Sequence, residues 1–181
     1  MADTVDSPVA ELAELAEPRW LTTEEQHAWR SYLRGSRLLE AALDKDLQSH
    51  GVQLSEYEII SMLSEAPGRR LRMSGLADLV VQSRSRLTHT AARLERRGWV
   101  RRESCLEDRR GVELVLTDEG WAAVQDMARV HVDSVRRHLV DTMSPELFAA
   151  LGAAMDAISS AILSSGAAQE ADGGTVDSTL R

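Results

Sequence analysis

The sequence has one cysteine, no signal peptide pattern and no obvious membrane span. Cys105 cannot form a disulfide within the chain, which favours a reducing compartment. The first 20 residues have no basic segment followed by a continuous apolar stretch, so we expect no signal peptide and a cytoplasmic location. We also find no apolar run near the ~18 residues that a span needs. The sequence therefore predicts a soluble protein with no membrane partner.

Residue patterns typical of enzymes and metal sites are also missing. The sequence has no nucleophile elbow, phosphate-binding loop or convincing acid and base pair, so we predict no catalytic residues and no enzyme activity. The histidines form no His-x-x-His or His-x-x-x-His pair, and His131 and His138 are too far apart in sequence to hold one metal ion without help. We therefore predict no metal site and no cofactor.

Charge is distributed unevenly along the chain. The formal net charge is -8, yet residues 69–110 contain twelve arginines, no lysine and five acidic residues, for a net charge of +7. A basic block within an acidic chain is typical of a local binding site for a polyanion. The alternative is a solvated charged face. The basic residues of this block are all arginines, which favours a polyanion-binding site, because guanidinium groups suit phosphate and base edges better than ammonium groups do.

Two capping boxes predict the first two helices. Thr22 and Glu25 precede a long stretch of helical apolar spacing that closes at Gly51. Ser55 and Glu58 precede a shorter apolar stretch that closes at the following Pro-Gly pair. We therefore expect one long helix followed by one short helix.

The next segment predicts a helix-turn-helix. A very short helix from Ser74 to about Val81 is followed closely by a second helix, which Ser83 caps. In the second helix Leu87, Ala91 and Leu94 form the stripe that we expect to be buried. The other faces form a predicted recognition surface, which carries Arg84, Ser85, Arg86, Thr88, His89 and Arg93.

A β-ribbon and two long helices are expected after the helix-turn-helix. Residues 99–107 and 111–117 contain β-branched side chains in partial alternation and are separated by a "DRRG" turn, which predicts a two-stranded wing. Thr117 can cap a helix of about seven turns, and Ser144 and Pro145 begin a last helix. Long amphipathic helices on a small module cannot bury their apolar faces alone, so we predict a homodimer.

This order of elements, with "DRRGVELVLT", resembles the MarR/SlyA family of bacterial winged-helix regulators. The wing pattern of that family is met by Asp108, Arg110, Leu116 and Thr117, and "LTHTAARLERRGWV" and "TDEG" are also similar to it. The resemblance extends roughly from residue 21 to residue 163. It implies a mainly α fold with a small β-wing, in which N- and C-terminal dimerisation helices flank a winged helix-turn-helix.

The same resemblance implies a domain organisation. We expect a MarR-like domain at 19–165, with dimerisation helices at 21–50 and 118–165 and the winged helix-turn-helix at about 54–117. Residues 1–18, which are rich in alanine and acidic side chains, and residues 166–181, which are small and polar, are predicted to be disordered tails.

Carried over by position, the resemblance implies that residues 83–93 enter a major groove and that Arg110 reaches a minor groove, with Asp108 orienting it. Arginine can bridge two acceptors of guanine, and a narrow minor groove attracts a guanidinium. The alternative for Asp108 and Arg110 is an exposed ion pair of little consequence. Arg109 faces either phosphate or solvent. The predicted DNA-binding residues are Ser83, Arg84, Ser85, Arg86, Thr88, His89, Arg93, Asp108, Arg109 and Arg110.

One variant tests the wing assignment. Replacement of Arg110 by alanine is expected to weaken DNA binding substantially and to leave the fold intact, because the arginine is expected at the exposed tip of the wing. Titration of an operator duplex followed by fluorescence anisotropy measures the effect. Wild-type affinity in the variant would contradict the assignment.

Regulation can be predicted less closely. Family members are commonly released from DNA by small aromatic or phenolic ligands, which makes Trp29, Tyr32, Tyr57 and Trp121 candidate ligand-binding residues. The alternative for each is packing in the core or in a dimer interface. Cys105 lies among arginines that can lower the pKa of a thiol, so a thiol-redox sensor is a second alternative. The peroxide-sensing members, however, use a cysteine near the start of the first long helix, where this chain has none.

The sequence thus predicts a sequence-specific DNA-binding regulator, namely a ligand-responsive repressor that binds double-stranded DNA with an inverted-repeat operator as a homodimer. The alternative from another class is a weakly specific architectural DNA-binding protein, whose arginines contact only phosphate. The affinity ratio between specific and random duplexes separates the two.

Overall fold

The computed structural model describes residues 18–105 and 111–172, and the side chains up to residue 165. It divides into two units, Met1–Leu38 and Leu39–Arg181, and each is described by itself. Helix α1 begins in the first unit and ends in the second. The elements are α1 (Thr23–Gln48), α2 (Leu54–Glu65), η2 (Pro67–Arg69), β1 (Arg70–Arg72), α3 (Met73–Leu79), α4 (Arg84–Arg96), β2 (Val100–Ser104), β3 (Val112–Leu116), α5 (Asp118–His138), η3 (Val140–Thr142) and α6 (Pro145–Asp172). The predicted fold class, mainly α with a small β-wing, is confirmed.

Helix α1 begins at the predicted capping box. The backbone N–H of Thr22 donates to a carboxylate oxygen of Glu25 at 2.8 Å, and the backbone N–H of Glu25 donates to the Thr22 hydroxyl at 3.2 Å. These bonds satisfy N–H groups that have no partner within the helix. At the other end, Gly51 has a φ of 77°, a left-handed conformation that glycine adopts without strain and that stops the helix.

Helix α2 begins earlier than its predicted capping box, and that prediction is wrong. The helix starts at Leu54 with Gln53 as the N-cap, and the capping glutamate is Glu56, whose carboxylate accepts the Gln53 N–H at 3.0 Å. A second carboxylate, on Asp44 of α1, accepts the Leu54 N–H at 2.8 Å. The start of α2 is therefore determined partly by a residue ten positions upstream, which a local motif does not reveal.

Helices α3 and α4 form the predicted helix-turn-helix. The Ser83 hydroxyl accepts the Arg86 N–H at 3.2 Å, which confirms the predicted cap of α4. Leu87, Ala91 and Leu94 are buried, as their spacing predicted. Helix α3 ends at Leu79 rather than near Val81, since Val81 adopts a left-handed φ of 49° in the connecting turn.

The wing contains a third strand that the sequence did not reveal. Strand β3 lies between β1 and β2 and pairs antiparallel with both, in the order β1-β3-β2. The prediction of a two-stranded ribbon is therefore wrong in the number of strands. Strand β1 has only three residues, with Leu71 paired with Leu114, and three residues are too few to show a strand pattern.

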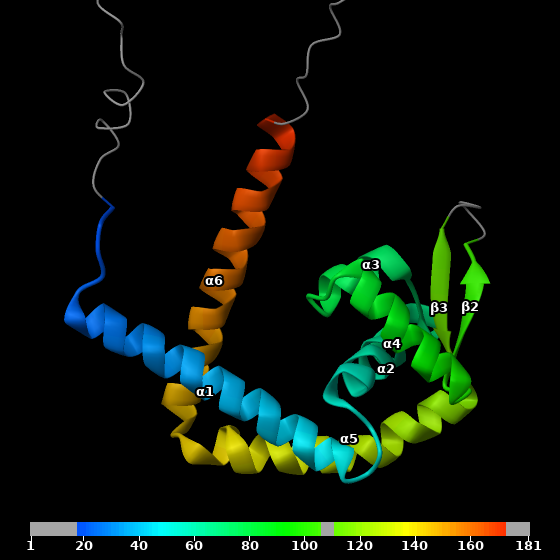
Figure 1. Cartoon of the computed structure of the whole chain (residues 1–181). Coiled ribbons are helices and arrows are strands. Elements are labelled where there is room, and N and C mark those ends of the chain that lie inside the picture. Colours follow the sequence, from blue (N-terminus) through cyan, green and yellow to red (C-terminus); the bar gives the residue numbers. More distant parts are fainter. Residues whose placement is uncertain (1–17, 106–110, 173–181) are drawn as a thin grey trace, which may run out of the picture. The chain divides into compact units, whose positions relative to one another are not determined.

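The core joins the helix-turn-helix, the sheet and α5 within the second unit. Figure 1 shows α2, α3, α4 and the two labelled strands gathered beside the first part of α5. Burial of each large apolar side chain of this core contributes roughly 1.5–3 kcal/mol to the free energy of unfolding. The most completely buried are Leu47, Ile59, Ile60, Leu63, Leu76, Leu87, Leu94 and Leu114.

Helix α5 starts where the chain passes very close to the loop before β2. Thr117 caps the helix as predicted, since its hydroxyl accepts the Gly120 N–H at 3.0 Å, and it also donates to the carbonyl of Gly98 at 2.7 Å. A Cβ atom at Gly120 would lie 2.0 Å from the carbonyl oxygen of Trp99 and 2.7 Å from a methyl carbon of Leu116. Glycine is therefore required here because two backbone segments approach closely.

Gly120→Ala is expected to lower the free energy of unfolding by about 3 kcal/mol, because the added methyl group must displace the Trp99 backbone. For a domain of this size we expect a melting temperature lower by about 6–12 °C. The matched control is Gly75→Ala in α3, where nothing lies within 4 Å of the added Cβ. Thermal melts followed by circular dichroism compare the two, and equal melting temperatures would contradict the close approach.

The two C-terminal helices end elsewhere than predicted. Helix α5 stops at His138 after 21 residues, rather than continuing through about seven turns, and Leu139 leaves the helical conformation at φ -131° and ψ -68°. Helix α6 runs to Asp172, seven residues beyond the predicted end of the domain at residue 165. Residues 1–17 and 173–181, which the predicted tails include, lie outside the described part of the chain.

The expectation that no apolar run is long enough for a membrane span is wrong for α6. Its segment Pro145–Ser165 has a mean hydropathy of 1.6 and qualifies by length and composition. Only Glu146 and Asp156 are charged in this segment, and alanines fill much of the rest. Large apolar side chains are exposed along it, namely Leu147, Phe148, Ile158, Ile162 and Leu163. The helix thus carries a continuous apolar surface that the described part of the chain leaves uncovered.

Candidate nucleic-acid interface

The first two turns of α4 expose polar and basic side chains. By helical spacing, Arg84 and Thr88 lie one turn apart, as do Ser85 and His89, and all four are exposed. The stripe opposite them packs into the core through Leu87, which is 1% exposed. The structure therefore brings four of the predicted recognition residues together on one solvent-facing side of the helix.

Two hydroxyl groups of this surface also support the helix. Ser83 accepts the Arg86 N–H, so its own hydrogen is left to donate to an external acceptor. The Thr88 hydroxyl donates to the Arg84 carbonyl at 2.8 Å, so its oxygen is left to accept. Ser83 can thus serve phosphate oxygens, and Thr88 can serve a base amino group, without loss of the helix.

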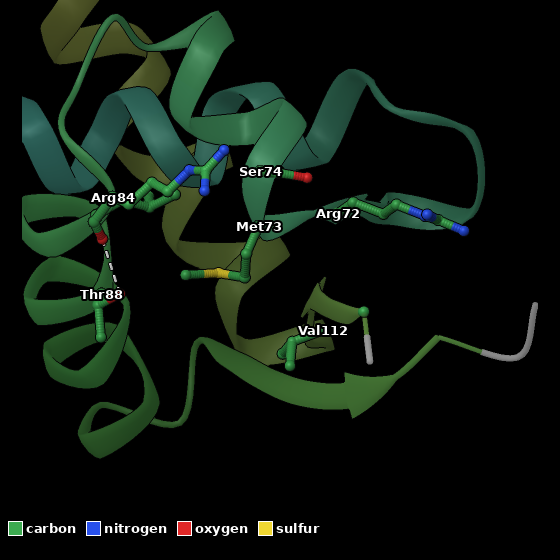
Figure 2. A pocket seen from close by; sticks show the side chains of 8 residues that line it. Arg72, Met73, Ser74, Arg84, Thr88 and Val112 are labelled. Atoms are coloured by element: carbon green, nitrogen blue, oxygen red, sulfur yellow. Dashed lines mark hydrogen bonds between the residues drawn. The ribbon is translucent and has the colours of Figure 1, made fainter. Parts of the chain in front are cut away.

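A cavity of about 410 Å³ lies beside this surface. Arg84 of α4 borders it on one side and Arg72, at the junction of β1 and α3, on the other (Figure 2). Ser74 and Val112, from α3 and β3, also line it. A concave site that joins the helix-turn-helix to the sheet and is bordered by the Arg84 side chain is suited to an anionic ligand such as a phosphate group.

Arg86 lies on the flank of α4 that faces α2. Burial raises the pKa of Glu58 in α2, and the nearby Glu40 carboxylate raises it further. Arg86 acts in the opposite direction and lowers the pKa of Glu58. The Arg86 guanidinium is therefore near an acidic side chain of its own chain, although it remains exposed.

Arg93 also turns towards α2. Its Nε donates to the Glu56 carboxylate at 3.2 Å, and one terminal nitrogen donates to the Gln53 side-chain oxygen at 2.5 Å. The predicted contact of Arg93 with DNA is untested. The structure gives this residue an intramolecular role that the sequence did not suggest.

The predicted wing tip, Asp108, Arg109 and Arg110, lies outside the described residues. Arginines of β2, beside it, already have partners within the sheet or in α4. Arg101 forms an ion pair with Glu103 at 2.7 Å. Arg102 donates to the Thr88 carbonyl at 3.1 Å and pairs with Glu95 at 3.4 Å, which ties β2 to α4. Much of the basic block therefore supports the module rather than facing a ligand freely.

The four candidate ligand-binding aromatics have different surroundings. Trp29 and Tyr32 stack on each other in the first unit, with ring centroids 5.9 Å apart, and both are exposed. Tyr57 belongs to the core of the second unit and lies 4.6 Å from the His131 ring. Trp121 is covered by the Arg69 guanidinium at 4.5 Å. Their predicted role in ligand binding is untested.

Cys105 and the histidines show no assembled reactive site in the described part of the chain. Cys105 is 5% exposed and its N–H donates to the Gly111 carbonyl at 2.9 Å, so its thiol is largely shielded from solvent. Burial lowers the pKa of His131, which keeps that ring neutral at neutral pH. Among the described residues, no three His, Cys, Asp or Glu side chains are grouped as metal ligands.

Comparison with known proteins identifies the family. A MarR family sequence model matches residues 50–111. AbsC, a MarR family transcriptional regulator from Streptomyces coelicolor, is 46% identical in sequence. Its crystal structure superposes with a TM-score of 0.77, and the match covers 81% of this chain and 99% of the AbsC chain. The chain belongs to the MarR family. It is a MarR-family winged-helix transcriptional regulator, and the predictions of the family and of a protein that is not an enzyme are confirmed.

Two further MarR relatives extend the comparison. Sco3205 from the same organism, whose structure was determined in complex with DNA, is 46% identical with a TM-score of 0.75 and covers 78% of this chain and 90% of its own. The regulator PecS of Dickeya dadantii is 34% identical over 62% of this chain and 66% of its own. The chain spans about half to two thirds of the length of the curated relatives that it matches.

Sequence reasoning missed Arg72 and Ser74 as members of this MarR-type surface. Both line the cavity beside α4, but strand β1 was not recognised, so nothing indicated that this segment turns back towards the wing. The concentration of arginine from residue 69 onwards was the available signal. It identified the region but not the side chains that border the cavity.

Proposed function

We propose that this MarR-family regulator binds double-stranded DNA in a sequence-specific manner, with the first two turns of α4 in the major groove. The observation that carries the proposal is the exposed side of α4, where Arg84, Ser85, Thr88 and His89 offer donors and acceptors for base edges and phosphates. The DNA complex of Sco3205, at 46% identity, supports this role. Arg86, on the flank of the helix, would contact the phosphate backbone of the DNA.

The wing is proposed to reach the adjacent minor groove. Asp108 and Arg110 match the family pattern in sequence, and Arg109 stands between them in the segment that connects β2 and β3 along the chain. A guanidinium is attracted to the negative potential of a narrow minor groove. In this arrangement Asp108 would orient Arg110, and Arg109 would face phosphate.

The protein is proposed to act as a homodimer. The exposed apolar side chains of α6, among them Ile158 and Ile162, need a cover, and a second copy of the same helix supplies one of matching chemistry. In this organisation residues 21–50 and 118–165 form the dimerisation helices, and about 54–117 form the winged helix-turn-helix of a 19–165 domain. A two-fold dimer would place two modules about 34 Å apart and would favour an inverted-repeat operator.

We propose that the protein is a cytoplasmic repressor and that a small aromatic or phenolic effector releases it from DNA. MprA of Escherichia coli, which is 32% identical over 51% of this chain, is a transcriptional repressor, and this supports repression rather than activation. Among the candidate aromatics, Trp29 and Tyr32 are exposed enough to receive a ligand, whereas Tyr57 would have to leave the core.

Selection of bound DNA from a random pool tests the proposal. We expect one enriched motif with two-fold symmetry and half-sites one helical turn apart. Light scattering of the protein with the enriched duplex should give two chains per duplex. Retention of DNA without any enriched motif would favour the architectural alternative, and no retention at low salt would exclude both.

A further inference from the structure

Helix α2 carries a buried carboxylate that faces the recognition helix. Glu56 is 1% exposed, although carboxylates are almost never fully buried unless they are paired. One oxygen accepts from Nε of Arg93 at 3.2 Å. The other accepts the Gln53 N–H at 3.0 Å and lies 3.6 Å from a terminal nitrogen of Arg97. Two arginines from the C-terminal end of α4 thus neutralise one buried charge on α2.

The same two arginines contact the connection between α1 and α2. Arg97 donates to the Gly51 carbonyl at 2.8 Å, and Arg93 donates to the Gln53 side chain at 2.5 Å. A cavity of about 290 Å³ lies between these groups. The rear of α4 is therefore held by charge-assisted bonds to α2 and to the preceding loop, and not by apolar packing alone.

Arg93 and Arg97 follow the recognition residues along α4, but their guanidinium groups are bound to α2 and to the loop before it. Ser85, His89, Arg93 and Arg97 follow one another at intervals of one helical turn, and the last two have partners in α2 and in the loop before it. The Nε and one terminal nitrogen of Arg93 already donate hydrogen bonds to Glu56 of α2 and to Gln53 of the loop. This geometry opposes a direct contact between Arg93 and DNA.

We propose that Glu56 is a positioning residue for DNA recognition, which fixes the direction of α4 through Arg93 and Arg97. Arg93 and Arg84 are nine residues apart, or about 14 Å along a helix. A change of about 10° in the direction of α4 at this anchor moves Arg84 by about 2 Å, which is enough to break a hydrogen bond to a base edge. The cluster therefore controls discrimination between sequences more than attraction to phosphate. This inference rests on the proposed function.

The test is Glu56→Gln, measured with a duplex selected from the random pool and with a random duplex. Glutamine keeps the shape and can still cap α2, but the charge that holds the two arginines is lost. We expect the affinity for the selected duplex to fall about tenfold and that for the random duplex to stay within about twofold, which is a loss in the specificity ratio only. The matched control is Asp141→Asn, which removes one carboxylate from the exposed pair with Arg136 at 2.7 Å. Its ratio should equal that of the wild type.

Arg93→Gln distinguishes positioning from contact. A lysine or arginine that touches phosphate contributes about one unit to the slope of log affinity against log salt. We expect the slope to be unchanged in Arg93→Gln and the specificity ratio to fall as in Glu56→Gln. The double variant should be no worse than Glu56→Gln, because that substitution already removes the charge to which Arg93 binds. If Glu56→Gln does not fold, Arg93→Gln alone carries the test.

The outcomes separate this inference from the function on which it rests. A wild-type chain with no preference for any selected duplex contradicts the proposed function itself. A wild-type preference that survives in folded Glu56→Gln and Arg93→Gln contradicts only the positioning role, and so does a reduced salt slope in Arg93→Gln. A lower melting temperature with an unchanged ratio would show that the cluster serves stability alone.

Discussion

Replacement of Arg84 by alanine is expected to lower the affinity for the selected duplex by about 1–3 kcal/mol, or five- to 150-fold. Arg84 stands in the first turn of α4, is exposed, and borders the cavity that joins the helix-turn-helix to the sheet. Figure 2 shows its side chain extending along that cavity. A bidentate contact with guanine and a contact with phosphate are both within the chemistry of the group.

The two contacts give different results. If Arg84 reads a base, the loss should be confined to duplexes with the preferred base at one position of each half-site. If it binds phosphate, the loss should be uniform and the salt slope should fall by about one. The matched control is Arg96→Ala, which removes the same charge from the other end of the same helix, where the side chain is also exposed. Equal affinity in Arg84→Ala and wild type would contradict the placement of this turn against DNA.

Replacement of Ile158 by aspartate in α6 is expected to convert the dimer into a monomer and to lower operator affinity roughly a hundredfold. Ile158 belongs to the exposed apolar surface of α6, and a buried unpaired carboxylate at a helix interface costs several kcal/mol. A monomer loses the second half-site, and linkage of two sites contributes about 10²- to 10⁴-fold in avidity. Sedimentation and anisotropy titration measure the two effects.

Ser160→Asp is the control for this variant. It adds the same charge to the same stretch of α6, but at one turn from Asp156, on the side that already carries a charge. This variant should remain dimeric and keep its affinity. If Ile158→Asp also remains a dimer at micromolar concentration, the assignment of α6 to the interface is wrong.

Features that depend on neighbouring residues could be predicted from the sequence. The caps at Thr22, Ser83 and Thr117 formed as predicted, since each joins a side chain to a backbone N–H three residues away. The buried stripe of α4 followed from helical spacing alone. These signals were sufficient for the fold class and for the position of the recognition helix.

Features that depend on distant residues could not be predicted in this way. The start of α2 is determined in part by Asp44, and the burial of Glu56 is compensated by arginines about 40 residues later. Strand β1 is recognisable only through its pairing with β3, which follows more than 40 residues later. Arg93 was predicted to be a recognition residue because its position outside the buried stripe of α4 showed nothing of the carboxylate beside it.

The most direct test of the account is the ratio of dissociation constants for the selected duplex and a scrambled duplex of equal length. The measurement uses the full chain at one fixed salt concentration, because the phosphate contribution then cancels between the two duplexes. A sequence-specific MarR-type regulator is expected to bind the selected duplex at least about a thousandfold more tightly. A ratio near one, with both duplexes bound, would contradict sequence-specific recognition by α4.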